Sequence, residues 1–206
     1  MDQINQIRGI IFDFGRVICD FDVRIFLRKA ASYCAKSPEE LGELMASTME
    51  FANAYETGLI TTGEFFAQVS ERAALRMPME EFVRAYTEIF TPIETTFDLV
   101  RRLKPRYRMG LLSNTSELHF EKGIKPVAIF PLFDAVSLSY EVRSMKPDRK
   151  IYDDAIRKMG LPPGACVYID DIAANVAAGA ALGLRALHYT THDALLGDLR
   201  RLGVTV

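Results

Sequence analysis

Apolar residues along the chain gather into short runs, which are separated by longer segments in which they recur every three or four positions. Short apolar runs that end in polar residues are typical of buried strands, and the longer recurrence is typical of amphipathic helices. The predicted strands are GIIFDF (9–14), YRMGLLSN (107–114), FDAVSLS (133–139), ACVYIDD (165–171) and, with a weaker pattern, LRALHY (184–189).

Helical patterns precede three of the later runs. They cover residues 95–104, 148–160 and 173–183, and the second has Asp148 placed as its N-cap and Gly160 as its stop. Strands that alternate with helices predict a parallel sheet with helices on both faces. We therefore expect an α/β protein whose core is a Rossmann-like parallel sheet.

The stretch from about 20 to 91 has a different pattern, with helical periodicity and no convincing strand. The segments SPEE (37–40) and TTGE (61–64) both have the spacing of a capping box, in which the first and fourth residues cap the start of a helix. We expect an all-helical insert directly after the first strand. The core then comprises residues 1–19 and 92–206, and the insert comprises residues 20–91.

Composition excludes several classes of function. The 206 residues carry a net charge of −2 and are 49% hydrophobic, which suits one core with a smaller attached subdomain. The charge balance gives no basic surface for binding nucleic acid. No apolar run is long enough to span a membrane, and the first residues lack the features of a signal peptide. Three widely spaced cysteines fit reduced thiols in a cytoplasmic protein. The sequence gives no indication of the oligomeric state.

Polar residues follow the predicted strands at the edge of the sheet where ligands bind in open parallel sheets. They are Asp13, Ser113, Asn114, Lys146, Asp170 and Asp171. Three carboxylates brought together repel one another unless a cation lies among them, and oxygen ligands suit Mg²⁺. A lysine and a hydroxyl beside a metal suit a phosphate, and an aspartate can attack it as a nucleophile. Each residue alone would be an ordinary turn or capping residue, but the set predicts phosphate chemistry.

These motifs resemble those of the haloacid dehalogenase-like (HAD) hydrolase superfamily. In FDFGRV, the resemblance implies that Asp13 is the nucleophile. In LLSNT, it implies that Ser113 binds the phosphoryl group, with Asn114 beside it. In SMKPD, it implies that Lys146 balances charge between the nucleophile and the substrate. The insert corresponds to the helical cap of the family, and YETGLITTGEFF is similar to caps of its soluble phosphatase branch.

The fourth motif of the family corresponds to VYIDDIAANVAAGAALGL. Here the resemblance implies that Asp170 and Asp171 bind Mg²⁺ together with Asp13 and the backbone carbonyl of Gly15, with Asn175 one turn into the helix. It also implies hydrolysis of a small phosphorylated metabolite through an aspartyl-phosphate.

Gly15 departs from the family pattern. Active phosphatases of this superfamily carry a second aspartate two residues after the nucleophile as a general acid and base, a role typically worth about 10²–10⁴-fold in rate. Either the leaving group needs little protonation, as in a sugar 1-phosphate, or another acid enters from the following loop, where Asp20 and Asp22 lie. A bacterial branch with glycine at this position includes an α-glucose-1-phosphate phosphatase, and the chain is similar to it. A sugar phosphate is therefore the expected substrate.

Three alternatives stay open. Gly15 leaves room for a catalytically impaired family member that binds a phosphate ligand or a protein partner. A haloacid dehalogenase needs no metal and tends to have an aromatic residue at this position and an arginine soon after it, whereas Arg16 sits one residue late. A receiver-type phospho-acceptor has its acid pair early in the chain and lacks a cap.

Substrate choice is expected to lie on the cap face and the loop after the first strand. The candidate residues are Asp20, Asp22, Arg24 and Tyr55, although Arg24 and Tyr55 fit a packing or surface role equally well. The three histidines have no visible ligand spacing, and no role is assigned to them.

Overall fold

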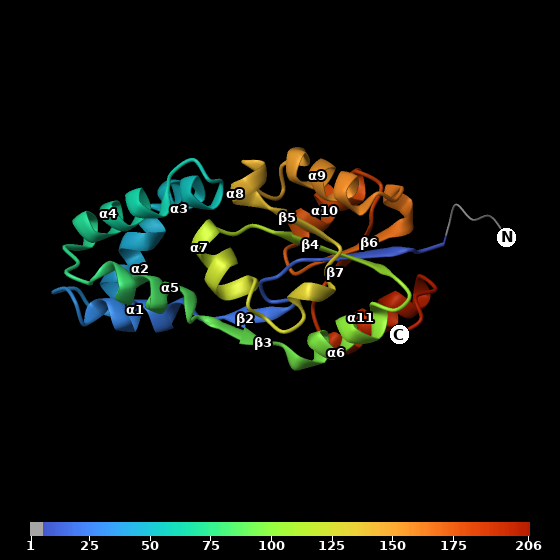
Figure 1. Ribbon diagram of the computed structural model, residues 1–206, viewed down its shortest axis with the longest axis horizontal. Helices are drawn as coiled ribbons and strands as arrows, with labels where there is room; N and C mark the ends of the chain where they lie inside the picture. Colours follow the sequence, from blue (N-terminus) through green and yellow to red (C-terminus); the bar gives the residue numbers. More distant parts are fainter. Residues whose placement is uncertain (1–5) are drawn as a thin grey trace.

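A five-stranded parallel sheet lies at the centre of residues 6–206, the part of the chain that this computed structural model describes. The strand order is β5-β4-β1-β6-β7 (Figure 1). The strands are β1 Gly9–Phe12, β4 Arg108–Ser113, β5 Ala135–Leu138, β6 Cys166–Asp170 and β7 Arg185–His188. All five lie within the runs predicted from the sequence, so the expected α/β fold with a parallel sheet is confirmed.

Helices cover both faces of this sheet. Side chains of β1 alternate between the faces, so that Ile10 and Phe12 pack with α6 (Glu94–Leu103) and α11 (His192–Arg201). Ile11 points the other way, toward the cluster that includes α9 (Arg149–Met159) and α10 (Ala173–Ala181). In Figure 1, α9 lies above the sheet and α6 and α11 lie below it. Burial on both faces explains why the strands read as nearly continuous apolar runs.

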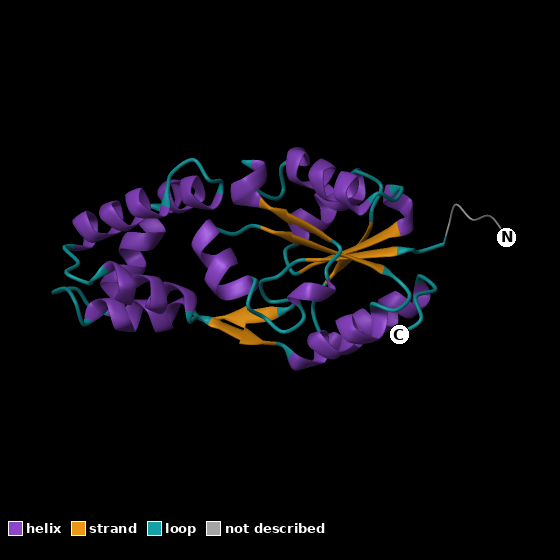
Figure 2. Cartoon of the chain, viewed as in Figure 1, coloured by secondary structure: helices purple, strands orange, loops and turns teal. Residues whose placement is uncertain are grey.

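The segment after the first strand forms a helical body of its own (Figure 2). Both predicted capping boxes are present, at Ser37 with Glu40 and at Thr61 with Glu64. The rings of Phe26, Phe65 and other aromatic residues fill the apolar centre of this body. Its helices are α1 Val23–Ala31, α2 Pro38–Ser47, α3 Met49–Glu56, α4 Thr62–Ala73 and α5 Met79–Thr87.

A short antiparallel ribbon joins this helical body to the sheet domain, where the sequence pattern indicated no strand. It pairs β2 (Cys19–Phe21) with β3 (Phe90–Pro92). The expected boundaries, near 20 and 91, therefore fall inside two paired strands. Strands of three residues are too short to show an alternating pattern, and their pairing joins segments far apart in the sequence.

The helical body also contacts the sheet domain at α8 (Ser139–Val142) and α7 (Glu117–His119). Ser139 Oγ donates a hydrogen bond to the backbone oxygen of Glu56 at 2.6 Å. Gly58 has a φ of +67°, and a Cβ at this position would lie 2.3 Å from the backbone oxygen of Tyr140. Glycine is therefore required for this close contact. No helix in the described chain has both the length and the apolar character needed to cross a bilayer.

Candidate active site

Asp13 lies one residue beyond β1, between the ends of the two strands that flank it, β4 and β6. Its backbone N–H donates to the oxygen of Ile169 at 2.9 Å, which fixes it beside β6. Its carboxylate accepts the N–H of Phe14 at 2.7 Å. The residue is buried. Burial raises the pKa of Asp13 to about 6, against the opposing effect of the Lys146 ammonium.

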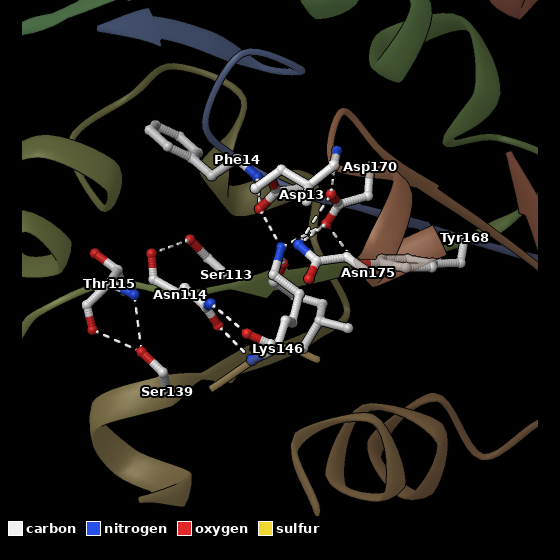
Figure 3. A network of polar contacts seen from close by, with 12 residues as sticks. Asp13, Phe14, Ser113, Asn114, Thr115, Ser139, Lys146, Tyr168, Asp170 and Asn175 are labelled. Carbon is white, nitrogen blue, oxygen red and sulfur yellow. Dashed lines mark hydrogen bonds and ion pairs between the residues drawn. The ribbon is translucent and has the colours of Figure 1, made fainter. Parts of the chain in front are cut away.

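Lys146 provides the buried positive charge at this edge. Its Nζ lies 2.6 Å from Oδ1 of Asp13 and 2.7 Å from Oδ2 of Asp170, and it donates to the oxygen of Leu112 at 3.1 Å (Figure 3). Burial opposes its charge, but the two carboxylates raise the pKa of Lys146 above the ordinary value. Lys146 is therefore held as a cation between two strand ends.

Asn114 holds Lys146 in place through its backbone. The Nδ2 of Asn114 donates to the oxygen of Lys146 at 3.0 Å, and the N–H of Lys146 donates to Oδ1 of Asn114 at 2.7 Å. The amide side chain of Asn114 is thus occupied in positioning the lysine. The sequence predicted a place for Asn114 beside the phosphoryl group, and it did not predict this use of the side chain.

Asp170 is enclosed by donors. Besides Lys146, its carboxylate accepts hydrogen bonds from the Tyr168 hydroxyl, the N–H of Ile172 and Nδ2 of Asn175. Burial favours the neutral form, but the Lys146 ammonium and these donors hold the pKa of Asp170 below its ordinary value. Asp170 is therefore an ionised, rigidly oriented carboxylate, and Asn175 serves to orient it.

Asp171 differs from Asp170, because no other side chain in residues 6–206 donates to its carboxylate. Burial, followed by the charge of Asp170, raises the pKa of Asp171. One oxygen from each of Asp13, Asp170 and Asp171 lies within 4.8 Å of the others. Three carboxylates against one ammonium leave an excess of negative charge, and hard oxygen ligands in such a cluster fit a cation of the Mg²⁺ type.

Ser113 ends β4 beside this cluster. It is buried, and its hydroxyl contacts only the neighbouring oxygen of Asn114, at 3.4 Å, among the described residues. The next residue, Thr115, already donates its N–H to Oγ of Ser139 at 2.8 Å. The hydroxyl of Ser113 is thus available for a ligand, whereas the N–H of Thr115 is not.

Gly15 lies next to the ring of Phe21. An added Cβ at Gly15 would approach this ring to 3.2 Å, which is a tight contact. The residue that adopts a left-handed backbone is the next one, Arg16, with a φ of 58°, and its guanidinium lies over the same ring. Steric contact with Phe21, and not backbone conformation, is what limits a larger side chain at Gly15.

The other residues expected to select the substrate lie outside this cluster. Asp20 is exposed on β2 and accepts the N–H of its neighbour Phe21. Asp22 caps α1 and forms an ion pair with Arg24 at 2.8 Å. Tyr55 is buried in the helical body, where it stacks on Phe65. None of these contacts brings the four side chains to Asp13.

A largely apolar cavity of about 380 Å³ lies between the helical body and the strand ends. Its lining includes Gly15 and Ser113 from the sheet domain, and Glu56 and His119, which sequence reasoning missed. Glu56 lies in YETGLITTGEFF (55–66), the segment similar to family caps, but no pattern within it singles out Glu56, and none marks His119. The apolar lining residues come mainly from the helical body and the ribbon: Phe14, Phe21, Val23, Phe26, Met45, Met49, Ala52, Phe65, Tyr86, Ile89, Phe90 and Ile124.

The chain is similar in sequence to proteins that are named as phosphatases. The chain is 27% identical to a D-ribitol-5-phosphate phosphatase of Bacteroides thetaiotaomicron, over 86% of this chain and 89% of the relative. It is 24% identical to a sesquiterpene phosphatase of Aspergillus oryzae, over 95% and 96% of the two chains.

Solved structures show the same fold. A predicted HAD-like family hydrolase from Porphyromonas gingivalis superposes with a TM-score of 0.80 and 24% identity, covering 98% of this chain and 100% of the other. A HAD family enzyme of B. thetaiotaomicron, solved as a magnesium complex, superposes with a TM-score of 0.77 and 21% identity over 89% and 93% of the two chains. The model of haloacid dehalogenase-like hydrolases matches residues 7–183, so the chain belongs to this family, and its relatives support a phosphoric monoester hydrolase.

Proposed function

We propose that the protein is a Mg²⁺-dependent phosphatase that hydrolyses a small organic phosphate through an aspartyl-phosphate on Asp13. The observation that carries the proposal is the buried arrangement of Asp13, Lys146 and Asp170 next to Asp171. The named phosphatases among its relatives support the same reaction class. We further propose that residues 20–91 act as the cap over this site and that the protein works in the cytoplasm.

In the first step, a carboxylate oxygen of Asp13 attacks phosphorus and the bond from phosphorus to the alcohol oxygen breaks. Lys146 attracts the phosphoryl oxygens, and the Ser113 hydroxyl donates to one of them. In the second step, water attacks the phosphorus of the aspartyl-phosphate, which releases inorganic phosphate and restores Asp13. The rigid contacts of Lys146 and Asp170 hold the groups in position, which lowers the entropic cost of the reaction.

Asp13, Asp170, Asp171 and the backbone carbonyl of Gly15 are the groups that would hold the metal. A bound Mg²⁺ supplies charge neutralisation for the phosphoryl oxygens. The magnesium complex of a structural neighbour supports this choice of ion. The excess of negative charge around Lys146 gives the physical reason, because it would weaken the binding of a phosphate unless a cation offset it.

Two classes of alcohol compete as the leaving group. A sugar phosphate is the substrate expected from the sequence, and the D-ribitol-5-phosphate phosphatase among the relatives, which acts on the phosphate of a related polyol, supports this class. The apolar lining of the cavity supports a second candidate, the phosphate of an apolar alcohol, because sugar hydroxyls without hydrogen-bond partners are costly to bury. The sesquiterpene phosphatase among the relatives agrees with this candidate.

The proposal is tested by assaying the purified protein with Mg²⁺ against sugar, polyol, aryl and isoprenoid phosphates. Release of inorganic phosphate is the expected result, and the ranking of substrates decides between the two leaving groups. Acid quenching during turnover, followed by borohydride reduction, should convert the acyl-phosphate at position 13 to homoserine, which mass spectrometry detects. Absence of turnover with every phosphate would instead support an impaired protein that binds a phosphate ligand or a protein partner. Turnover of a 2-haloacid would support a dehalogenase.

A further inference from the structure

Gly15 leaves the active site without an acid at the usual position, and the structure offers one from the opposite wall of the cavity. Among the described residues that line this cavity, which include Gly15 and Ser113, Glu56 is the only one with a carboxyl group. It lies at the end of α3, in the helical body. A substrate whose phosphate lies at Ser113 would extend its alcohol into this cavity, toward Glu56.

The position of Glu56 is fixed relative to the phosphate site by backbone contacts. Its backbone oxygen accepts a hydrogen bond from Ser139 Oγ at 2.6 Å, and the same oxygen atom of Ser139 accepts the N–H of Thr115 at 2.8 Å. Thr115 directly follows the Ser113–Asn114 segment. The close contact between Gly58 and the backbone of Tyr140 fixes the turn that follows Glu56. The main chain at Glu56 is therefore tied to the loop that carries Ser113.

The surroundings of Glu56 favour a protonated carboxyl group. No donor in residues 6–206 forms a hydrogen bond to its carboxyl oxygens, and the cavity walls around it are largely apolar. Burial raises the pKa of Glu56 to about 6. The other titratable groups on the cavity wall carry no positive charge that would stabilise an ionised Glu56. Burial lowers the pKa of His119 to about 4 and raises that of Tyr86, so both are neutral near pH 7.

We propose that Glu56 is the general acid and base of this enzyme and that it takes the role left open by Gly15. The proposal rests on the phosphatase function proposed above. As the bond from phosphorus to the alcohol oxygen breaks, its electron pair stays on that oxygen, which takes the proton of the Glu56 carboxyl group. In the second step, the Glu56 carboxylate takes a proton from the attacking water. The bond from phosphorus to the Asp13 oxygen then breaks, and both carboxyl groups return to their starting states.

The dependence on leaving group tests this role. Glu56→Gln keeps the size of the side chain and removes the proton. It should lower kcat/KM by about 10²–10⁴-fold for alkyl phosphates, whose alkoxides need a proton. It should leave nitrophenyl phosphate nearly unchanged, because nitrophenolate leaves without one. Glu50→Gln is the matched control, since Glu50 lies on the same helix, is exposed and does not line the cavity.

Several outcomes would overturn the proposal. An equal loss for alkyl and nitrophenyl phosphates would mean that Glu56 has a structural role, and no loss for either would remove it from the reaction. If Glu56→Gln does not fold, the test is the dependence of the wild-type kcat/KM on the pKa of the leaving alcohol. A proton donor predicts a shallow dependence, and a steep dependence would contradict the proposal. A wild-type protein that hydrolyses no phosphate would overturn the proposed function itself, and the role of Glu56 with it.

Discussion

The Nζ atom of Lys146 lies 2.6 Å from Oδ1 of Asp13, and both side chains are shielded from water. The pair joins the end of β1 to the segment that follows β5, and Asp170 on β6 completes it at 2.7 Å. A buried lysine between two carboxylates stays charged, so it can hold Asp13 in place and attract a phosphate. This contact accounts for an acid at the end of a buried strand.

Asp13→Asn should abolish turnover, because the amide has nearly the same shape as the carboxylate and is a poor nucleophile. Release of inorganic phosphate measures the loss, and thermal unfolding of the same sample checks that the fold is kept. Mass spectrometry must exclude deamidation back to aspartate. Near-normal turnover in a sample free of aspartate would remove Asp13 from the nucleophile role.

Removal of the metal should suppress activity, and the two adjacent aspartates should respond differently to substitution. EDTA should stop turnover and added Mg²⁺ should restore it. Asp171→Asn should raise the Mg²⁺ concentration needed for half-maximal activity with little change in unfolding temperature, because no other described side chain donates to Asp171. Asp170→Asn should also lower the unfolding temperature, since Lys146, Tyr168 and Asn175 all bind this carboxylate. Full activity in chelated buffer would contradict the metal requirement.

Lys146→Met should reduce both activity and stability. Removing one partner of a buried ion pair typically costs about 3–5 kcal/mol, because the remaining charges lose their compensation. Urea unfolding measures this loss, and phosphate release measures the activity, which should fall by at least about 100-fold. Lys150→Met is a suitable control, since Lys150 lies on the exposed part of α9. Retention of activity by Lys146→Met would argue against its role in binding the phosphate.

In the Glu56→Gln background, Gly15→Asp should restore the turnover of alkyl phosphates only in part, whereas in the wild-type protein, where Glu56 already supplies the proton, it should add little. The backbone at Gly15 does not need glycine, but the new Cβ would lie 3.2 Å from the Phe21 ring. Adding Phe21→Ala should relieve this contact and bring the recovery closer to the ~10²–10⁴-fold that a positioned acid supplies. The measurement is kcat/KM for alkyl phosphates, with Glu56→Gln and Glu56→Gln/Phe21→Ala as the controls. A full recovery by Gly15→Asp without Phe21→Ala would show that the Phe21 ring moves aside freely, and a large gain in the wild-type background would contradict the role of Glu56.

His119 should lower the stability of the folded protein as the pH drops from about 6.5 toward 4, whereas the raised pKa values of Asp13 and Glu56 act in the opposite direction. Burial lowers the pKa of His119 to about 4, so over this range the unfolded chain binds a proton that the folded chain does not. The effect is at most about 3 kcal/mol. His119→Phe keeps a ring against Tyr86 and removes the titration. Between pH 7 and pH 5, the free energy of unfolding measured in urea should change more favourably in His119→Phe than in the wild type, and an equal change in both would contradict this role of His119.

The sequence by itself determined the sheet and the set of residues at its edge. Apolar runs marked the five strands, and the acids, the serine and the lysine followed them in order. Because parallel strands end at one edge, residues that each follow a strand are brought together whatever the details of packing. Asp13 and Asp170 are neighbours for this reason, although 156 residues separate them in the chain.

Only the tertiary structure decided how the helical body meets this edge. The β2–β3 ribbon, the ring of Phe21 beside Gly15 and the place of Glu56 in the cavity all depend on contacts between segments far apart in the sequence. Local periodicity carries no information about such contacts, since it reports which face of an element is buried and not what that face meets. The sequence therefore pointed to Asp20 and Asp22, which are close to Asp13 along the chain, whereas packing of the helical body brought Glu56 to the cavity.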